Sequence, residues 1–256
     1  MELIDGKEIL ELVAAARGLV LDHEAAGHVK VKGRSDYVTQ VDFRVQEFFQ
    51  RELKERYPDI QFLGEEEKVQ VDFERPCWIL DPVDGTANLI HDLRLSAISL
   101  ALYDGEDIVF GVVSNPFTGE TFYAAKGEGS YLNGRPIRVS ETKKMENAII
   151  STGTSPYRRD LADENFAIFR RVFDACSDIR RFGSAAIDLA YVACGRLDGY
   201  VERDLKPWDF AAGVLLVQEA GGRISGFTGG PVSVRGNMDL AASNGLLNGE
   251  LIGLLG

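Results

Sequence analysis

Apolar residues recur at helical spacing in the first quarter of the chain. They repeat every three or four positions over residues 9–20 and again over 41–53, which predicts two amphipathic helices. Pro58 would end the second helix, because proline cannot donate the backbone hydrogen bond that continues one. Short apolar runs at 60–63 and 78–80 predict two strands after it.

The middle of the chain is rich in short β-prone runs. Asp104-Gly105 and Asn133-Gly134 separate neighbouring runs, and both dipeptides favour the tight turns of β-hairpins. The pattern therefore predicts a largely antiparallel meander of four or five strands. Its runs cover residues 96–103, 108–115, 121–125, 131–132 and 137–139.

Strand and helix patterns alternate in the C-terminal half. This alternation, after a run of strands, indicates an α+β protein or a layered α/β/α protein. No repeat or linker interrupts the chain, so we expect a single domain, 1–256, with a first lobe of about 1–145 and a second of about 146–256. The predicted strands are 147–151, 179–182, 199–202 and 240–243, and the predicted helices are 161–176, 185–193, 210–220 and 246–254.

Composition and charge restrict the function. Of the 256 residues 45% are hydrophobic, so the chain can bury a large core, and no apolar run reaches the roughly 20 residues of a membrane span. The net charge of -12 argues against nucleic-acid binding, which needs a basic surface, and any phosphate substrate would need a cation at its site. The three cysteines are far apart in the sequence and lie among apolar residues, which predicts reduced thiols and a cytoplasmic location.

The segment WILDPVDGTANLIH combines two acids, a turn and a helix start. We expect Asp81 just past a buried strand, with Pro82 leaving the sheet and a turn bringing Asp84 back beside the first acid. Gly85 allows close approach of a ligand, and the free N–H groups of a helix that begins at Thr86 bind phosphate oxygens. Two carboxylates beside an anion site would repel the anion unless divalent cations lay between them, so the segment predicts a metal site.

Other interpretations of these acids compete with a metal site. An Asp turn followed by a helix cap would need no ligand. Haloacid-dehalogenase-type phosphatases carry DxDGT after an apolar strand, but here Pro82-Val83 separates the two acids. Elsewhere, Glu65 follows a predicted strand, while Asp209 and Asp42 lie at helix starts. A surface acid or a helix cap would also explain each of these three.

Four segments taken together resemble the signatures of the inositol monophosphatase family. They are DYVTQVD (36–42), GEE (64–66), DPVDGTANLIH (81–91) and WDFAAGVLLVQEAGG (208–222), and the resemblance extends from about residue 7 to 252. It implies an α+β fold, a layered α-β-α-β-α sandwich. It also implies an enzyme, usually a homodimer, that hydrolyses a small phosphate ester, requires Mg²⁺ and is often inhibited by Li⁺.

The resemblance further implies which residues bind two to three Mg²⁺ ions. Glu65, Asp81 and the carbonyl of Val83 match the ligands of one ion. Asp81, Asp84 and Asp209 match the ligands of a second. A third ion would lie near Glu65, bound mostly through water.

Catalytic and phosphate-binding groups are implied in the same way. Thr86 and Asp42 match the pair that orients and deprotonates the attacking water, with Glu65 as a further catalytic group. The backbone N–H groups of Gly85 and Thr86 match those that hold the phosphate. The reaction would be a direct in-line attack of a metal-activated water on phosphorus.

The substrate side of the site is implied by three further positions. Glu202 matches an acid that accepts hydrogen bonds from inositol hydroxyls, and Ser184 and Ala185 match residues that line the sugar. Asp84 and Asp209 would contact the substrate as well as a metal ion.

The expected substrate is inositol-1-phosphate, and two alternatives remain open. Arg203 and Lys206 are nearby bases that could favour a doubly phosphorylated substrate, which would make the chain a 3′-phosphoadenosine 5′-phosphate or fructose-1,6-bisphosphate phosphatase. An alternative from a different class is a regulatory or binding protein that retains the fold. The intact acids of the site argue against lost catalysis.

Overall fold

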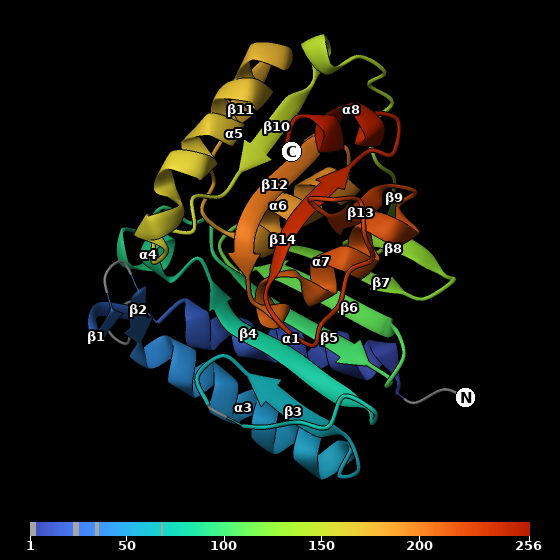
Figure 1. Cartoon of the computed structure of the whole chain (residues 1–256). Helices are drawn as coiled ribbons and strands as arrows, with labels where there is room; N and C mark the ends of the chain where they lie inside the picture. Colours follow the sequence, from blue (N-terminus) through green and yellow to red (C-terminus); the bar gives the residue numbers. More distant parts are fainter. Residues whose placement is uncertain (1–3, 23–25, 34–35, 68) are drawn as a thin grey trace.

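The chain folds into five layers in which helices alternate with two β-sheets (Figure 1). The computed structural model describes residues 4–22, 26–33, 36–67 and 69–256. The predicted α-β-α-β-α sandwich of the α+β class is therefore confirmed.

The helices occupy the two outer layers and the middle one. They are α1 (Gly6–Val20), α3 (Gln40–Arg56), α4 (Thr86–Ile90), α5 (Ala162–Ala175), α6 (Ala185–Ala193), α7 (Pro207–Glu219) and α8 (Asn248–Gly253), with 3₁₀ turns at Met145–Asn147 and Arg159–Leu161. Helices α1 and α3 cover the larger sheet, α6 and α7 lie between the sheets, and α5 and α8 cover the smaller sheet (Figure 1). No helix among the described residues is both long and apolar enough to cross a membrane.

The larger sheet is the predicted meander, extended by two strands. Its β3–β4 pair is parallel and its other neighbouring pairs are antiparallel. The two turn dipeptides lie in the β5–β6 and β8–β9 connections, as predicted. In spatial order the strands are β3 (Gln61–Gly64), β4 (Cys77–Asp84), β5 (Ala97–Tyr103), β6 (Ile108–Asn115), β7 (Glu120–Ala125), β8 (Gly129–Leu132) and β9 (Arg135–Ile137).

The smaller sheet contains the strands of the C-terminal half. In spatial order they are β11 (Asp178–Arg180), β10 (Ile149–Thr152), β12 (Gly199–Leu205), β14 (Met238–Ser243) and β13 (Arg223–Gly226). Strand β10 is parallel to both neighbours, whereas β14 is antiparallel to both of its own. The chain passes from the larger sheet to the smaller between β9 and β10.

Strand β4 is buried on both faces, which explains its continuous apolar sequence. Trp78 and Leu80 face α1 and α3, whereas Ile79 faces the middle helices. The middle layer packs tightly on this sheet, because a Cβ at Gly111 of β6 would lie 2.9 Å from the Ala212 carbonyl oxygen of α7. This packing holds the start of α7 beside the end of β4.

Five elements differ from the sequence-based expectation. Strand β4 continues through Pro82 to Asp84, because a bulge accommodates the proline within the strand. Helix α7 begins at Pro207 rather than near residue 210, since proline suits the first helical turn. The hairpin of β1 (Val29–Gly33) and β2 (Asp36–Thr39) and strand β13 were not predicted.

Candidate active site

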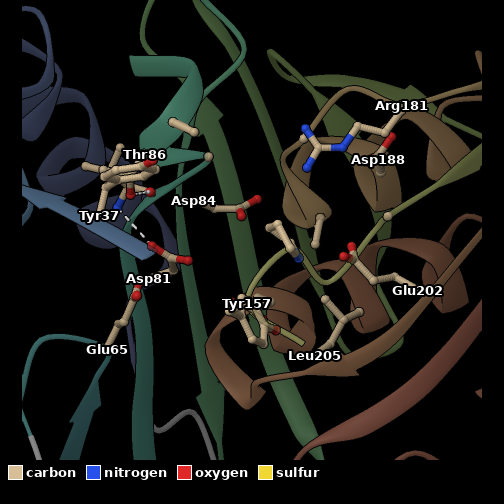
Figure 2. Close-up of a pocket in the computed structure, with 18 residues that line it drawn as sticks. Tyr37, Glu65, Asp81, Asp84, Thr86, Tyr157, Arg181, Asp188, Glu202 and Leu205 are labelled. Carbon is tan, nitrogen blue, oxygen red and sulfur yellow. Dashed lines mark hydrogen bonds between the residues drawn. The ribbon is translucent and has the colours of Figure 1, made fainter. Parts of the chain in front are cut away.

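A pocket of about 170 Å³ opens where the end of β4 meets the starts of α4, α6 and α7 (Figure 2). The loop after β10 and the middle of β12 form the opposite wall. Each element therefore brings a terminus or a bulge to the pocket, and these are the places where backbone and side-chain polar groups are available.

The β4 bulge turns two carboxylates toward the same pocket. Residues three apart in a regular strand point to opposite faces. Asp81 pairs with Ser99 of β5 and Asp84 with Ala97, so β4 carries one extra residue between the two acids. Both acids then line the pocket (Figure 2). The Val83 N–H donates to Asp81 Oδ1 at 2.9 Å and fixes that side chain.

The start of α6 holds the carboxylate of Asp84. Its Oδ2 accepts hydrogen bonds from Ser184 Oγ at 2.5 Å and from the Ala186 N–H at 2.7 Å. Burial nevertheless raises the pKa of Asp84 to about 6. One oxygen is thus used by the fold, which leaves Oδ1 for the pocket.

Asp209 contributes a third carboxylate from the first turn of α7. Its Oδ2 accepts a hydrogen bond from the Lys206 N–H at 2.7 Å, so it also caps the helix. One oxygen from each of Asp81, Asp84 and Asp209 lies within 4.8 Å of the others. Burial, and then the charges of neighbouring carboxylates, raise the pKa values of Asp81 and Asp209. Three such oxygens could hold a divalent cation.

Glu65 reaches the same pocket from the end of β3 (Figure 2). Its backbone N–H donates to the Leu80 carbonyl at 3.2 Å, which continues the parallel β3–β4 ladder by one residue. Its charge contributes to the raised pKa of Asp81. Gln46 of α3 fixes the following turn by accepting a hydrogen bond from the Glu66 N–H at 2.9 Å.

Asp42 lies behind the pocket and contacts it through Thr86. Its Oδ2 accepts hydrogen bonds from the N–H and the hydroxyl of Thr39, at 2.8 and 2.6 Å, which forms a capping box for α3. Its Oδ1 accepts one from Thr86 Oγ1 at 3.2 Å. Burial raises the pKa of Asp42, although the hydrogen bonds from Thr39 oppose the shift.

Glu202 of β12 forms the opposite wall. The Tyr200 hydroxyl donates to its Oε2 at 2.5 Å and the Ser155 N–H donates to its Oε1 at 3.0 Å. A Cβ at Gly153 would lie 1.7 Å from Oε2, so only glycine leaves room for the carboxylate there. Burial raises the pKa of Glu202.

Most of the residues predicted from sequence line this pocket. They are Glu65, Asp81, Val83, Asp84, Gly85, Thr86, Ala185, Glu202 and Asp209. Ser184, expected to line the sugar, is 2% exposed and lies behind Asp84, because its hydroxyl is used by that carboxylate.

Nine residues that line the pocket were not among the site residues predicted from sequence. Gly153 and Tyr157 belong to the GTSPY loop, whose run of turn residues was the available signal. The structure adds Asp188, which accepts a hydrogen bond from Ser151 at 2.5 Å. Arg181 is the second arginine of the RRFGS segment. The remaining residues are Tyr37, Ala87, Pro156, Gly183 and Leu205.

The two bases considered for a second phosphate do not face the pocket. Arg203 pairs with Glu164 and Asp239, and Lys206 Nζ lies 3.5 Å from Asp204. Carboxylates at the protein surface therefore balance both positive charges, so neither residue supports binding of a doubly phosphorylated substrate.

The layered α+β fold and the acidic pocket together indicate a phosphatase. The chain belongs to the inositol monophosphatase family, whose model matches residues 6–255.

Individual relatives agree with this assignment. Inositol-1-monophosphatase of Rhizobium meliloti (strain 1021) is 44% identical over 203 residues, which cover 79% of this chain and 76% of that protein. Nus factor SuhB of Xylella fastidiosa (strain Temecula1) is 42% identical over 202 residues, or 79% of this chain and 73% of that protein. A solved IMPase/NADP phosphatase complexed with Mg²⁺ and phosphate is 26% identical, with a TM-score of 0.88 over 97% of this chain and 94% of that one.

Proposed function

We propose that the chain is a Mg²⁺-dependent phosphate monoester hydrolase whose preferred substrate is inositol-1-phosphate. The observation that carries this proposal is the cluster of Asp81, Asp84 and Asp209 oxygens beside the Thr86–Asp42 hydrogen bond. The inositol-1-monophosphatase relative supports the reaction, and the neighbour complexed with Mg²⁺ and phosphate supports the cofactor.

The donor set fits Mg²⁺. Hard divalent cations prefer oxygen ligands, and buried carboxylates that raise one another's pKa need a positive counter-charge. We assign Glu65, Asp81 and the Val83 carbonyl to one ion. Asp81, Asp84 and Asp209 are assigned to a second, and a third would lie near Glu65. When bound, the ions would neutralise phosphate charge and make the attacking water more acidic.

Thr86 and Asp42 would remove the proton of the attacking water. As Thr86 Oγ1 accepts that proton, its own proton can pass to Asp42 Oδ1 along the existing hydrogen bond. Burial raises the pKa of Asp42, so this carboxylate is a better base than an exposed aspartate. Glu65, on the other side of the cluster, would help to orient the water.

The remaining pocket groups would bind the substrate. The N–H groups of Gly85 and Thr86 lie at the first turn of α4, where no earlier carbonyl within the helix can accept from them, and would hold phosphate oxygens. Ala185 and Glu202 would contact the leaving alcohol, the latter by accepting hydrogen bonds from ring hydroxyls. Ser184 would act indirectly, by orienting Asp84.

A second role as a binding protein is the alternative from a different class. It is favoured by the relative named Nus factor SuhB. Such a role would accompany catalysis, since the acids proposed as ligands are all present and line the pocket.

The test is phosphate release by the purified protein from inositol-1-phosphate, fructose-1,6-bisphosphate and 3′-phosphoadenosine 5′-phosphate. Each would be measured with Mg²⁺, with EDTA and with Li⁺ added, alongside sizing of the expected homodimer. Fastest release from inositol-1-phosphate, abolished by EDTA, is expected. Faster release from a bisphosphate would contradict the proposed preference for inositol-1-phosphate. No release from any of the three compounds would favour the alternative role as a binding protein.

A further inference from the structure

The pocket contains one positive charge among many negative ones. Among the described residues that line it, Arg181 is the only lysine, arginine or histidine. The acids there are Glu65, Asp81, Asp84, Asp188, Glu202 and Asp209. Figure 2 shows the Arg181 side chain extending from the β11–α6 connection into the pocket, above Asp188.

The Arg181 guanidinium is available for a ligand. It is exposed and forms no ion pair within the described ranges, and its Nη2 donates one long hydrogen bond, of 3.4 Å, to Thr154 Oγ1. Its neighbour Arg180 differs, because that guanidinium pairs with Asp178 and donates to the Ile179 carbonyl at 2.8 Å. Most of the Arg181 donors are therefore free to bind an anion.

Two glycines fix how this guanidinium lies relative to the proposed phosphate end of the pocket. A Cβ at Gly183 would lie 2.4 Å from Arg181 Nη1, so the guanidinium occupies the space that a side chain would fill. A Cβ at Gly85 would in turn lie 3.1 Å from the Gly183 carbonyl oxygen. Gly183 therefore lies in space between the guanidinium and the start of α4. Asn88 fixes this arrangement by donating to the Phe182 carbonyl at 2.8 Å.

We propose that Arg181 is a specificity-determining residue that recognises a second phosphate on the substrate, on the leaving-group side of the pocket. This inference rests on the proposed phosphatase function and adds bisphosphorylated polyols as further substrates beside the preferred inositol-1-phosphate. Arginine binds phosphate through two parallel N–H donors, and without it the surrounding carboxylates would repel a second anion. Hydroxyl groups of a monophosphate need no such cation, because Glu202 already offers an acceptor.

The test compares two substrates that differ by one phosphate, inositol-1-phosphate and inositol-1,4-bisphosphate. In Arg181→Gln, kcat/KM for the bisphosphate should fall about 10- to 100-fold, as expected for loss of hydrogen bonds to a charged group, with little change for the monophosphate. Arg181→Lys should restore part of the loss, since it keeps the charge without the paired donors. Arg180→Gln is the matched control, and it should leave both substrates unaffected.

Binding is measured independently of turnover with the methylenephosphonate analogues of both substrates, by titration calorimetry. The bisphosphonate analogue should bind wild type more tightly than Arg181→Gln, and added salt should narrow the difference. An equal fall in kcat/KM for both substrates in Arg181→Gln would overturn the proposal. It would show instead that Arg181 acts by balancing the charges of Asp188 and Glu202. Hydrolysis of the monophosphate without binding of the bisphosphonate analogue would also overturn it, with the phosphatase function intact. If wild type hydrolyses neither substrate, the phosphatase function fails, and the calorimetry alone decides for or against Arg181.

Discussion

At the scale of single residues, three acids at the site use one carboxylate oxygen to hold the fold. Asp84 and Asp209 keep the other oxygen for the pocket, and Asp42 uses it to accept a hydrogen bond from Thr86. Asp42, Asp84 and Asp209 each accept a backbone hydrogen bond through Oδ2. Their burial also raises their pKa values, so the site is electrostatically unfavourable until a cation or a proton enters.

Asp81→Asn should remove activity while making the metal-free protein more stable. The substitution removes a ligand assigned to both ions, so kcat should fall by more than ~99%, which is within the several kcal/mol that metal ions contribute to catalysis. Its amide oxygen can still accept from the Val83 N–H. Without the buried charge, Tm in EDTA should rise by about 2–4 °C, which corresponds to about 1 kcal/mol. Near-normal phosphate release by a folded variant would refute the assignment.

The stability of the metal-free protein should decrease as pH rises from 5 to 7. The pKa of Asp84 is about 6 in the fold and 3.8 as the ordinary value, so its contribution is fully present at low pH and is lost as the carboxyl ionises through about pH 6. Asp81 and Asp209 shift in the same direction. Thermal scans in EDTA would therefore give a higher Tm at pH 5 than at pH 7, and Tm should depend less on pH in Asp84→Asn. A Tm in EDTA that rose with pH would contradict this.

Saturating Mg²⁺ should raise Tm more at pH 7 than at pH 5, because protons compete with Mg²⁺ for the carboxylates.

At the scale of elements, the site depends on backbone that leaves room for side chains. The β4 bulge turns two acids toward the pocket, and the loop after β10 leaves space for the carboxylate of Glu202. Because glycine has no Cβ, Gly153 sets the position of that carboxylate.

Gly153→Ala should weaken recognition of inositol more than it weakens hydrolysis itself. The added methyl group would displace the Glu202 carboxylate from its bonds to Tyr200 and Ser155. KM for inositol-1-phosphate should rise about 10-fold or more, as for the loss of one charged hydrogen bond. Turnover of p-nitrophenyl phosphate, which has no ring hydroxyls, should change little. Gly236→Ala, where a Cβ would meet nothing within 4 Å, is the control. Equal effects on both substrates would argue against the proposed role of Glu202.

The elements themselves were largely predictable from sequence, because apolar periodicity and turn dipeptides are local signals. The bulge was not, since it depends on how β4 registers with β5 across the sheet. The β1–β2 hairpin was not predicted, although Val29 and Val31 alternate with lysines. It forms a separate two-stranded sheet in which Val29 and Val31 are 39% and 70% exposed, so it adds little to the core. Asp81, Asp84 and Asp209 could be proposed from acids at the ends of elements. Arg181 could not, since only tertiary packing shows that it lines the pocket and forms no ion pair with the part of the chain that the structure describes.

At the scale of the whole molecule, one apolar cluster joins the two sheets. It contains Ile79 of the larger sheet and Tyr200 of the smaller, together with the middle helices. This shared core makes independent unfolding of the two sheets unfavourable, and the two lobes expected from sequence stay a prediction. We therefore propose one cooperative unit.

Heat should unfold the chain in a single transition. Trp78 lies in the core between the larger sheet and its outer helices, and Trp208 lies at the start of α7. In Trp208→Phe, fluorescence would report the larger sheet alone, and its midpoint should coincide with that of calorimetry. Wild type in the same buffer is the control. Separate midpoints would show that the lobes unfold independently.

Because the carboxylates of Asp42, Asp84 and Asp209 also accept backbone hydrogen bonds, they restrict how such a protein could lose its catalytic activity during evolution. Alanine at Asp42, Asp84 or Asp209 would abolish the chemistry and also remove the acceptor of a helix-start N–H, so selection for a folded chain would tend to eliminate it. Asparagine would silence the same position yet keep an acceptor oxygen. A descendant of this protein that survives as a non-enzymatic scaffold should therefore carry asparagine at these positions far more often than alanine.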